Sequence, residues 1–331
     1  MNFSSPLPTL LLIPTGIGCE IGGYAGDAIP VARLLASASG CLITHPNVMN
    51  GASLFWNDER IQYVEGYSID RFVCGDFFLR PVRKQKVGVL LDAGLEPELR
   101  ERHLQVVDGC RATLGLDIGP VVTTETPLEV MPRASSSGIS WGELANLDPL
   151  LRAGDRLKEY GATAIAIVTR FPDELSSKAL DDYRRGQGVD LIAGAEAVIS
   201  HSLVKHLCIP CANSPALSPL PIEYCLDPRA AGEELGYTFL PSVLVGLSRA
   251  PDLIPKAILP KINNISQPSL IGIEHLGALV APKGALGGPA ILGCIERNIP
   301  LIVVSNSGVL KVDLEALGLI DKLEPLSSSN I

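Results

Sequence analysis

A glycine-rich segment near the C-terminus has the residues best suited to bind an anion. Lys283 is followed by Gly284, Gly287 and Gly288 in the sequence PKGALGGP. Backbone amides in such a turn, beside one ammonium group, favour a phosphate or a carboxylate. The spacing matches neither the Walker A pattern nor the dinucleotide fingerprint. A turn needed only for tight packing explains the same glycines, so both interpretations stay open.

A second glycine-rich segment, TGIGCEIGGYAGD, lies near the N-terminus. Gly16 and Gly18 allow close approach of a ligand, and Glu20 and Asp27 supply two carboxylates. Such a pair can act as general acid and base or hold a divalent cation, which is the one cofactor class the sequence suggests. Asp27 also precedes Ala28 directly, where it fits the N-cap of a helix.

Two further residues are candidates for moving protons. Glu196 begins a predicted helix over Ala195–Leu207 and points toward the expected ligand edge of a sheet. His45 precedes Pro46 at a predicted strand end, and histidine titrates near neutral pH. We therefore predict Glu196, His45, Asp27 and Glu20 as the catalytic candidates.

Polar side chains near predicted strand ends are the remaining binding candidates. Asn47, Asn213 and Asn306 each follow or end the second strand of a unit, although asparagine is also a common turn residue. Arg170 follows another strand and can clamp a carboxylate, but an ion pair with Asp173 is an equal alternative.

Cysteine, histidine and serine groups give weaker signals. The CIPC segment with His201 and His206 lacks the second ligand pair typical of a zinc site, so no metal ligand is assigned. It also looks extended, unlike a redox motif that opens a helix. The Ser135–Ser137 run has no nucleophile elbow around it.

Short apolar runs that alternate with helical patterns must position these residues. The alternation predicts an α/β fold with mainly parallel sheets, built from repeated strand, glycine-loop, helix and strand units. Predicted strands are Leu10–Pro14, Cys41–Thr44, Val87–Leu91, Ile118–Thr123, Ala162–Thr169, Val189–Ala193, Ala278–Ala281 and Leu301–Val304. Predicted helices are Ala28–Ala38, Pro97–Leu114, Leu175–Arg185, Ala195–Leu207 and Ala290–Arg297.

Chain length favours two lobes, since 331 residues exceed the roughly 250 to 300 at which single cores stop growing. The Ser- and Gly-rich stretch Pro132–Gly142 has no hydrophobic period that defines an element. We place the boundary there, which gives an N-terminal lobe over 1–140 and a C-terminal lobe over 141–331. Residues 223–249 have no assigned role.

Composition excludes several classes of partner. Hydrophobic residues make up 47% of the chain, which is typical of a folded globular protein. The net charge is −9, so we do not expect the protein to bind nucleic acid. Its apolar runs are too short to cross a membrane, and no secretion signal is recognised. Scattered cysteines fit reduced thiols, so we expect a cytoplasmic protein.

Several segments together carry a resemblance that covers nearly the whole chain. They are PTGIGCEIGGYAGDAIP, LITHPNVMNGA, YVEGYSIDRF, GAEAVISH, IPCANSPAL and ELGYTFLPSVLVGLSRAP. The chain resembles a family of uncharacterised cyanobacterial and plastid proteins, a domain of unknown function. The resemblance implies a soluble bacterial or stromal protein, and it implies no reaction and no catalytic residue.

The favoured hypothesis is a metabolic enzyme that binds a small carboxylate or phosphate metabolite in a cleft of glycine-rich loops and uses acid–base chemistry. Hydrolase, lyase and transferase chemistry all stay open. One alternative is a regulatory protein that senses a metabolite or nucleotide without turnover. Another is a cyclic-amide hydrolase with Ser200 or the Ser135–Ser137 run as nucleophile. Homodimerisation is plausible on general grounds.

Overall fold

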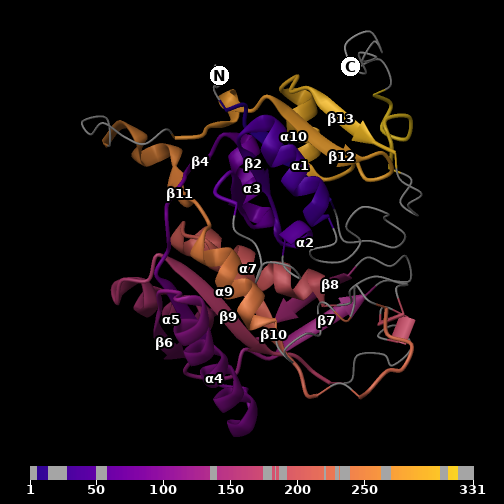
Figure 1. Cartoon of the computed structure of the whole chain (residues 1–331). Helices are drawn as coiled ribbons and strands as arrows, with labels where there is room; N and C mark the ends of the chain where they lie inside the picture. The colour runs from indigo at the N-terminus through magenta and orange to yellow at the C-terminus, as the bar shows by residue number, and fades with distance from the viewer. Residues whose placement is uncertain are drawn as a thin grey trace.

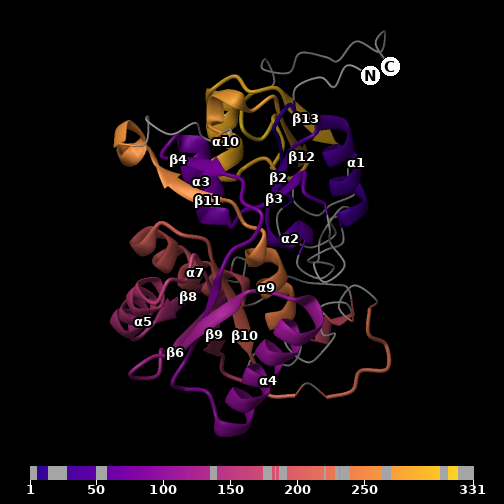
Figure 2. The ribbon, with the colours of Figure 1, turned by 60° about the vertical axis from the view of Figure 1, so that its left-hand side comes forward.

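A computed structural model describes residues 6–13, 28–49, 58–134, 140–173, 181–182, 184–185, 192–219, 221–227, 231, 239–261, 270–305 and 312–319. The chain is an α/β protein in which two parallel sheets each carry helices on both faces (Figures 1 and 2). Over the described ranges, no helix has the length and apolar character needed to span a bilayer.

The five-stranded sheet has the order β13-β12-β1-β2-β3, with every strand parallel to its neighbours. Its strands are β1 (Thr9–Leu11), β2 (Leu42–Thr44), β3 (Ile61–Tyr63), β12 (Ala278–Pro282) and β13 (Leu301–Val304). One face packs on α1 (Ile29–Ser39) and α2 (Pro46–Met49), and the other on α3 (Gly66–Cys74) and α10 (Pro289–Glu296). We call this unit the five-stranded lobe.

The four-stranded sheet has the order β10-β9-β5-β6 and is also parallel. Its strands are β5 (Val87–Leu91), β6 (Ile118–Thr123), β9 (Ala164–Arg170) and β10 (Cys211–Ala216). One face packs on α4 (Pro97–Leu114) and α9 (Leu240–Ser248), and the other on α5 (Leu147–Glu159) and α7 (Ala193–Leu207). We call this unit the four-stranded lobe.

Local signals explain where several helices begin and end. Proline lies in the first turn of α1, α4, α9 and α10, where its missing amide hydrogen costs nothing. Gly40, Gly75 and Gly115 follow α1, α3 and α4 with φ of 74°, 81° and 64°. Glycine adopts this left-handed conformation without a steric penalty, so it ends each helix.

The chain crosses between the lobes twice, through residues 81–86 and 249–251. Next to these crossings, β4 (Phe77–Arg80) pairs antiparallel with β11 (Asp252–Pro255). The buried Gln85 side chain donates hydrogen bonds of 2.8 Å to the Ala250 carbonyl and to Asp252, which also accepts from Arg80 Nε at 3.0 Å. These contacts brace the two crossings against each other.

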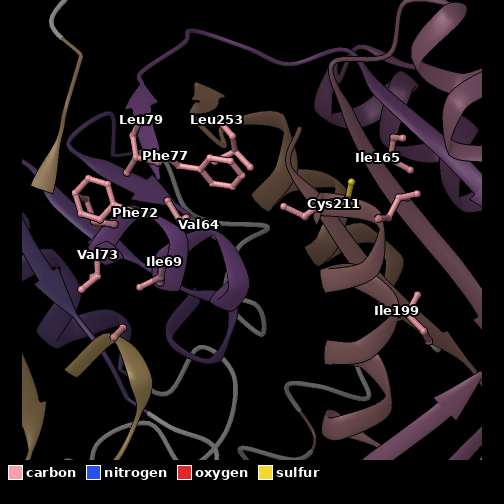
Figure 3. Close-up of a cluster of buried hydrophobic side chains, with 14 of the residues drawn as sticks. Val64, Ile69, Phe72, Val73, Phe77, Leu79, Ile165, Ile199, Cys211 and Leu253 are labelled. Atoms are coloured by element: carbon pink, nitrogen blue, oxygen red, sulfur yellow. The ribbon is translucent and has the colours of Figure 1, made fainter. Parts of the chain in front are cut away.

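The hydrophobic core is continuous between the lobes. One buried cluster joins α3 and α10 to α5 and α7, and a second joins α1 to α4 and α9. Figure 3 shows members of the first cluster from both lobes, with Val64 and Phe72 on one side and Ile165 and Cys211 on the other. The two lobes therefore pack directly against each other through buried hydrophobic side chains.

The expected lobe boundary does not follow the two sheets. Strands from both ends of the chain form the five-stranded sheet, because β12 pairs directly with β1. The four-stranded sheet is made wholly by the middle of the chain. A division into 1–140 and 141–331 would cut both sheets, since a parallel crossover returns the last unit beside the first strand.

Two local predictions also need correction. The stretch around Pro132–Gly142 was expected to lack structure, but β7 (Val130–Ala134) and β8 (Ser140–Leu144) pair antiparallel there. The predicted strand Val189–Ala193 ends inside a helix, because Ala193 begins α7. Residues 174–180, in the predicted helix Leu175–Arg185, lie outside the described residues. Short 3-10 helices cover Lys256–Lys261 and Ile273–His275.

Candidate functional site

A chain of hydrogen bonds fixes Glu196 in the first turn of α7. The Thr169 hydroxyl on β9 donates to Asn213 Oδ1 at 2.7 Å, and Asn213 Nδ2 donates to Glu196 Oε1 at 3.4 Å. Thr169 and Asn213 are buried, so water does not compete for these contacts. The amide of Asn213 is thereby oriented with its NH₂ group toward the carboxylate.

The β7–β8 hairpin holds the start of α7 from the other side. A Cβ added to Gly142 on β8 would overlap the backbone of Ala195, so only glycine allows this approach. Glu196 therefore sits on a helix turn confined between the hairpin and the sheet. A carboxylate at a helix N-terminus is also favoured by the helix dipole.

The second carboxyl group comes from the other lobe. Glu65 follows β3 and precedes the first residue of α3, and the Tyr63 hydroxyl donates to its Oε1 at 3.0 Å. The Tyr63 ring is fully buried and packs on the α9 backbone, where a Cβ on Gly246 would lie 2.7 Å from it. Tyr63 thus ties the end of β3 to a helix of the four-stranded lobe.

Burial controls the protonation of this pair. Desolvation raises the pKa of Glu65 to about 8, while the hydrogen bond from Tyr63 acts in the opposite direction. Glu65 is therefore mostly protonated at neutral pH. Burial raises the pKa of Tyr63 well above its ordinary value, with further increases caused by the carboxylates of Glu65 and Glu196.

Glu65 therefore contacts Tyr63 directly, and Glu196 of the other lobe acts on the same tyrosine electrostatically. Neighbouring groups complete the electrostatic environment: the Glu65 carboxyl adds to the raised pKa of the buried Cys211 thiol, and a Cβ on Gly66 would lie 3.8 Å from His201 Nε2. A carboxyl group that is protonated near neutral pH can act as a general acid. Among the described residues, no three His, Cys, Asp or Glu side chains come together to hold a metal ion.

Glu65 was absent from the sequence-based candidates. The sequence YVEGYS does contain a pattern like that of the other loops, because Glu65 lies between a short apolar strand and a glycine that begins a helix. The strand Ile61–Tyr63 contains Gln62 and is only three residues long, so its apolar pattern is weak. Nothing in the sequence relates Glu65 to Glu196, which lies in a distant part of the chain.

His45 has a structural contact at the end of β2. Its Nε2 accepts a hydrogen bond from the Ile13 amide at 3.0 Å, and Asn47 Nδ2 donates to the Ile13 carbonyl at 2.7 Å. Desolvation lowers the pKa of His45 to about 4. The imidazole is therefore neutral at pH 7 with one nitrogen engaged, which does not support the predicted role as a proton carrier near neutral pH.

The glycine loop after β12 is largely occupied by the protein itself. The Gly284 carbonyl accepts from the Val312 amide at 2.9 Å, and a Cβ on Gly287 would lie 2.9 Å from Val312. Burial raises the pKa of Asp70, and a hydrogen bond from the Ala290 amide at the start of α10 opposes this rise. One amide at this helix start is thus already paired with a carboxyl group of the protein.

Lys283 and Gly288 remain at the edge of that loop. The Lys283 side chain is exposed, and Gly288 is the N-cap of α10 with open space around its Cα. Packing against Val312 accounts for Gly287, so the tight-packing explanation holds for part of the loop. An ammonium group at the carboxyl end of β12 stays accessible.

Arg170 is held in ion pairs at the end of β9. Its guanidinium contacts Glu96 at 2.9 Å and Asp173 at 2.6 Å, and its side chain is 16% exposed. The hydrogen bonds to Asp173 and Glu96 raise its pKa further above the usual range. The alternative of a pair with Asp173 is therefore what the structure contains, and no described feature presents Arg170 to a ligand.

Asn47 and Asn213 do not form a row. Asn47 lies in α2 of the five-stranded lobe, whereas Asn213 lies inside β10 of the four-stranded sheet and not at its end. The strands next to these two residues belong to different sheets. Gly16, Gly18, Glu20, Asp27, Asn306 and Ser135–Ser137 lie outside the described residues.

Other candidates have ordinary structural partners. Ser200 Oγ donates to the Glu196 backbone carbonyl at 3.0 Å within α7, which does not suit a nucleophile. His206 contacts Asp155 at 2.9 Å, and the His201 ring lies 5.5 Å from that of Tyr67. His103 Nδ1 contacts the Leu99 carbonyl at 2.7 Å inside α4.

Comparison with known proteins covers almost all of this architecture. The model of a family described as "Protein of unknown function (DUF3326)" matches residues 8–325. A protein of Synechococcus sp., named as an uncharacterized lipoprotein, is 52% identical over 301 residues, or 91% of this chain and 82% of that protein. No solved structure matches the chain. The chain therefore belongs to the DUF3326 family of proteins of unknown function.

Proposed function

We propose that this protein is a metabolic enzyme that binds a small anionic metabolite between its lobes and carries out acid–base chemistry with Glu65 and Glu196. One observation carries the proposal: the Tyr63 hydroxyl donates to the Glu65 carboxyl group, whose pKa burial raises, and Glu196 of the other lobe acts electrostatically on the same tyrosine. A carboxyl group with a raised pKa is typical of acid–base sites.

In this proposal Glu65 is the proton donor. Its raised pKa leaves a proton available near neutral pH, and Tyr63 holds one of its oxygens in place. Glu196 is the proton acceptor, because Asn213 holds its carboxyl group at the N-terminus of α7. Hydrolysis, elimination and group transfer all fit such a pair.

The geometry limits what Lys283 can contribute. It follows β12, whereas Glu65 follows β3, and these strands are three spacings apart in the sheet. At ~4.8 Å per spacing their backbones are about 14 Å apart. Lys283 can therefore bind the anionic end of a ligand that reaches Glu65 only if that ligand is extended.

The test combines a ligand screen with turnover. We would screen carboxylates, phosphate esters, nucleotides and divalent cations by thermal shift and then assay each hit for chemical change. Glu65→Gln and Glu196→Gln should each lower turnover by ~10²–10⁴-fold, with the substitution of an exposed residue of α4, Glu98→Gln, as the matched control. Turnover that survives in both site variants would contradict the proposal.

A non-catalytic sensor is the second candidate, and the close packing of the junction favours it. The cavity beside Glu65 has room for about one water molecule, so a metabolite that enters there must move the lobes. Ligand binding would then change lobe arrangement without chemistry. Recovery of every bound ligand unchanged, with a lobe movement detected by small-angle scattering, would support the sensor over the enzyme.

For location we propose the cytoplasm, although the Synechococcus relative is named a lipoprotein. The described cysteines are free thiols, which fits a reducing compartment. The intact mass of protein from membrane and soluble fractions tests this, since a lipidated protein in the membrane fraction would contradict it.

A further inference from the structure

Ser68 has a buried hydroxyl group that is not satisfied within the protein. It lies in the first turn of α3 and is 1% exposed, yet its Oγ has no hydrogen-bond partner in the described part of the chain. A buried polar group without a partner costs free energy, and such groups in native proteins usually contact an ordered water. The Ser68 hydroxyl therefore indicates a bound molecule, such as an ordered water, that forms a hydrogen bond with it.

A small cavity lies beside this hydroxyl. Ser68, Glu65 and Tyr63 line it from the five-stranded lobe, and Pro210 and Leu247 close it from the four-stranded lobe. Figure 3 shows Val64 and Leu253, two further apolar residues that border it. Its volume suits about one water molecule and nothing larger.

The positions of Glu65 and Ser68 explain why they face the same space. Glu65 is the N-cap of α3 and Ser68 is the third residue of the helix, so their side chains occupy neighbouring places on one turn. The Glu65 side chain does not cap the helix, and its Oε1 instead accepts from Tyr63. A buried water needs at least two polar partners, and these two groups supply them.

We infer that one buried water molecule bridges the Ser68 hydroxyl and the Glu65 carboxyl, which makes Ser68 a positioning residue for the proton of Glu65. The water accepts from the Ser68 hydroxyl and donates to Glu65. The role in catalysis rests on the proposed function, whereas the water and its effect on Glu65 titration do not.

The other groups near Glu65 make their described contacts without Ser68. Tyr63 donates to Glu65 from β3, Cys211 lies near it at the start of β10, and Glu196 and His201 face the junction from α7. None of these contacts involves Ser68. A change in Glu65 titration in a Ser68 variant therefore reports the bridge.

The matched experiment compares Ser68→Ala with Ser214→Ala in the full-length protein. Ser214 also has a fully buried hydroxyl without a described partner, but it lies in β10 and does not line this cavity. The titration of Glu65 is followed by infrared difference spectroscopy of its carboxyl group, assigned with Glu65→Gln. High-resolution crystallography of the parent protein checks for the water directly.

We expect Ser68→Ala to move the Glu65 midpoint upward by roughly half to one pH unit, because loss of the bridge removes hydrogen bonding to the carboxylate form. Ser214→Ala should leave the midpoint unchanged. An unchanged midpoint in Ser68→Ala, or equal shifts in the two variants, would overturn the inference.

Stability gives a second and independent sign. If a water molecule accepts a hydrogen bond from the Ser68 hydroxyl, Ser68→Ala should unfold at a lower urea concentration than the parent protein, because that hydrogen bond is lost. If the hydroxyl has no partner at all, Ser68→Ala should unfold at a higher urea concentration, because an unsatisfied buried polar group is removed. A higher midpoint would overturn the bridge. Failure of the proposed function is read separately, since Glu65→Gln with full turnover would reject catalysis and leave the Ser68 titration result standing.

Discussion

The Tyr63 hydroxyl donates a 3.0 Å hydrogen bond to Glu65 Oε1, and the same ring packs on Gly246 of the other lobe. Protonation of Glu65 and packing between the lobes are therefore coupled through one side chain. The bond opposes the burial that raises the pKa of Glu65. Tyr63 thus lowers the pKa of the Glu65 carboxyl group as well as fixing its position.

Tyr63→Phe should raise the pKa of Glu65 further, because the hydrogen bond that stabilises its ionised form is lost. We also expect a loss of about 1 kcal/mol in the free energy of unfolding. An infrared pH titration of the Glu65 carboxyl measures the first effect and urea unfolding the second. A Glu65 midpoint that falls in this variant would contradict the assigned bond.

Glu65 should make stability depend on pH in a defined window. Its pKa is about 8 when folded and ~4.3 in an unfolded chain, so its contribution is full below pH 4.3 and is lost as pH rises through 8. His45 acts oppositely. Its folded pKa of about 4 lies below the unfolded value of ~6.5, so it adds stability above pH 6.5 that is lost as pH falls.

Between pH 6.5 and 8, Glu65 should therefore change the free energy of unfolding with pH, whereas His45 should not. Glu65→Gln removes this effect, so the decline in unfolding free energy across that window should flatten by at most about 1.4 kcal/mol per pH unit. Because Glu65 is partly exposed, we expect a smaller change than this limit. Urea unfolding at several pH values, with Glu98→Gln as control, measures it; identical slopes in parent and variant would count against a protonated Glu65.

Gly246→Ala should destabilise the junction. The new methyl group would lie 2.7 Å from the ring of Tyr63, which is fully buried. Overpacking of this kind costs about 1–3 kcal/mol. Gly109→Ala in α4 is the control, because nothing lies within 4 Å and alanine should stabilise that helix by ~0.5–1 kcal/mol. Equal effects of the two substitutions would refute the close packing.

Asp252→Ala should weaken the brace between the two crossings. It removes partners of Arg80 and of the Gln85 amide, which is 2% exposed. We expect a loss of about 1–3 kcal/mol, measured by urea unfolding, since a buried donor loses an acceptor. Asp108→Ala breaks the exposed pair with Arg111 and should cost less than ~0.5 kcal/mol. A loss no larger than that of the control would show that the brace is weak.

Sequence patterns predicted much of the fold because local rules determine it. Val87–Leu91, Pro97–Leu114, Ile118–Thr123 and Leu301–Val304 have the predicted bounds. Their apolar runs and Pro and Gly signals are strong enough to set the element without tertiary context. The β7–β8 hairpin was missed because its residues are largely exposed and show no alternating apolar face.

The site was harder to predict because its relationships are long-range. Glu196 was identified from its place at a helix start, but its counterpart Glu65 is 131 positions earlier in the sequence and in the other lobe. Likewise, no local pattern reveals that Asp70 faces α10 or that Val312 packs on Gly287. Sequence distance hides pairings that only the parallel crossovers create.

Titration of the Glu65 carboxyl in the parent protein tests the central claim most directly. An infrared difference spectrum between pH 6 and pH 10, with Glu65→Gln to assign the band, should show a protonated carboxyl that ionises with a midpoint of about 8. A midpoint near ~4.3, the value of an ordinary glutamate, would contradict the acid–base assignment of this site.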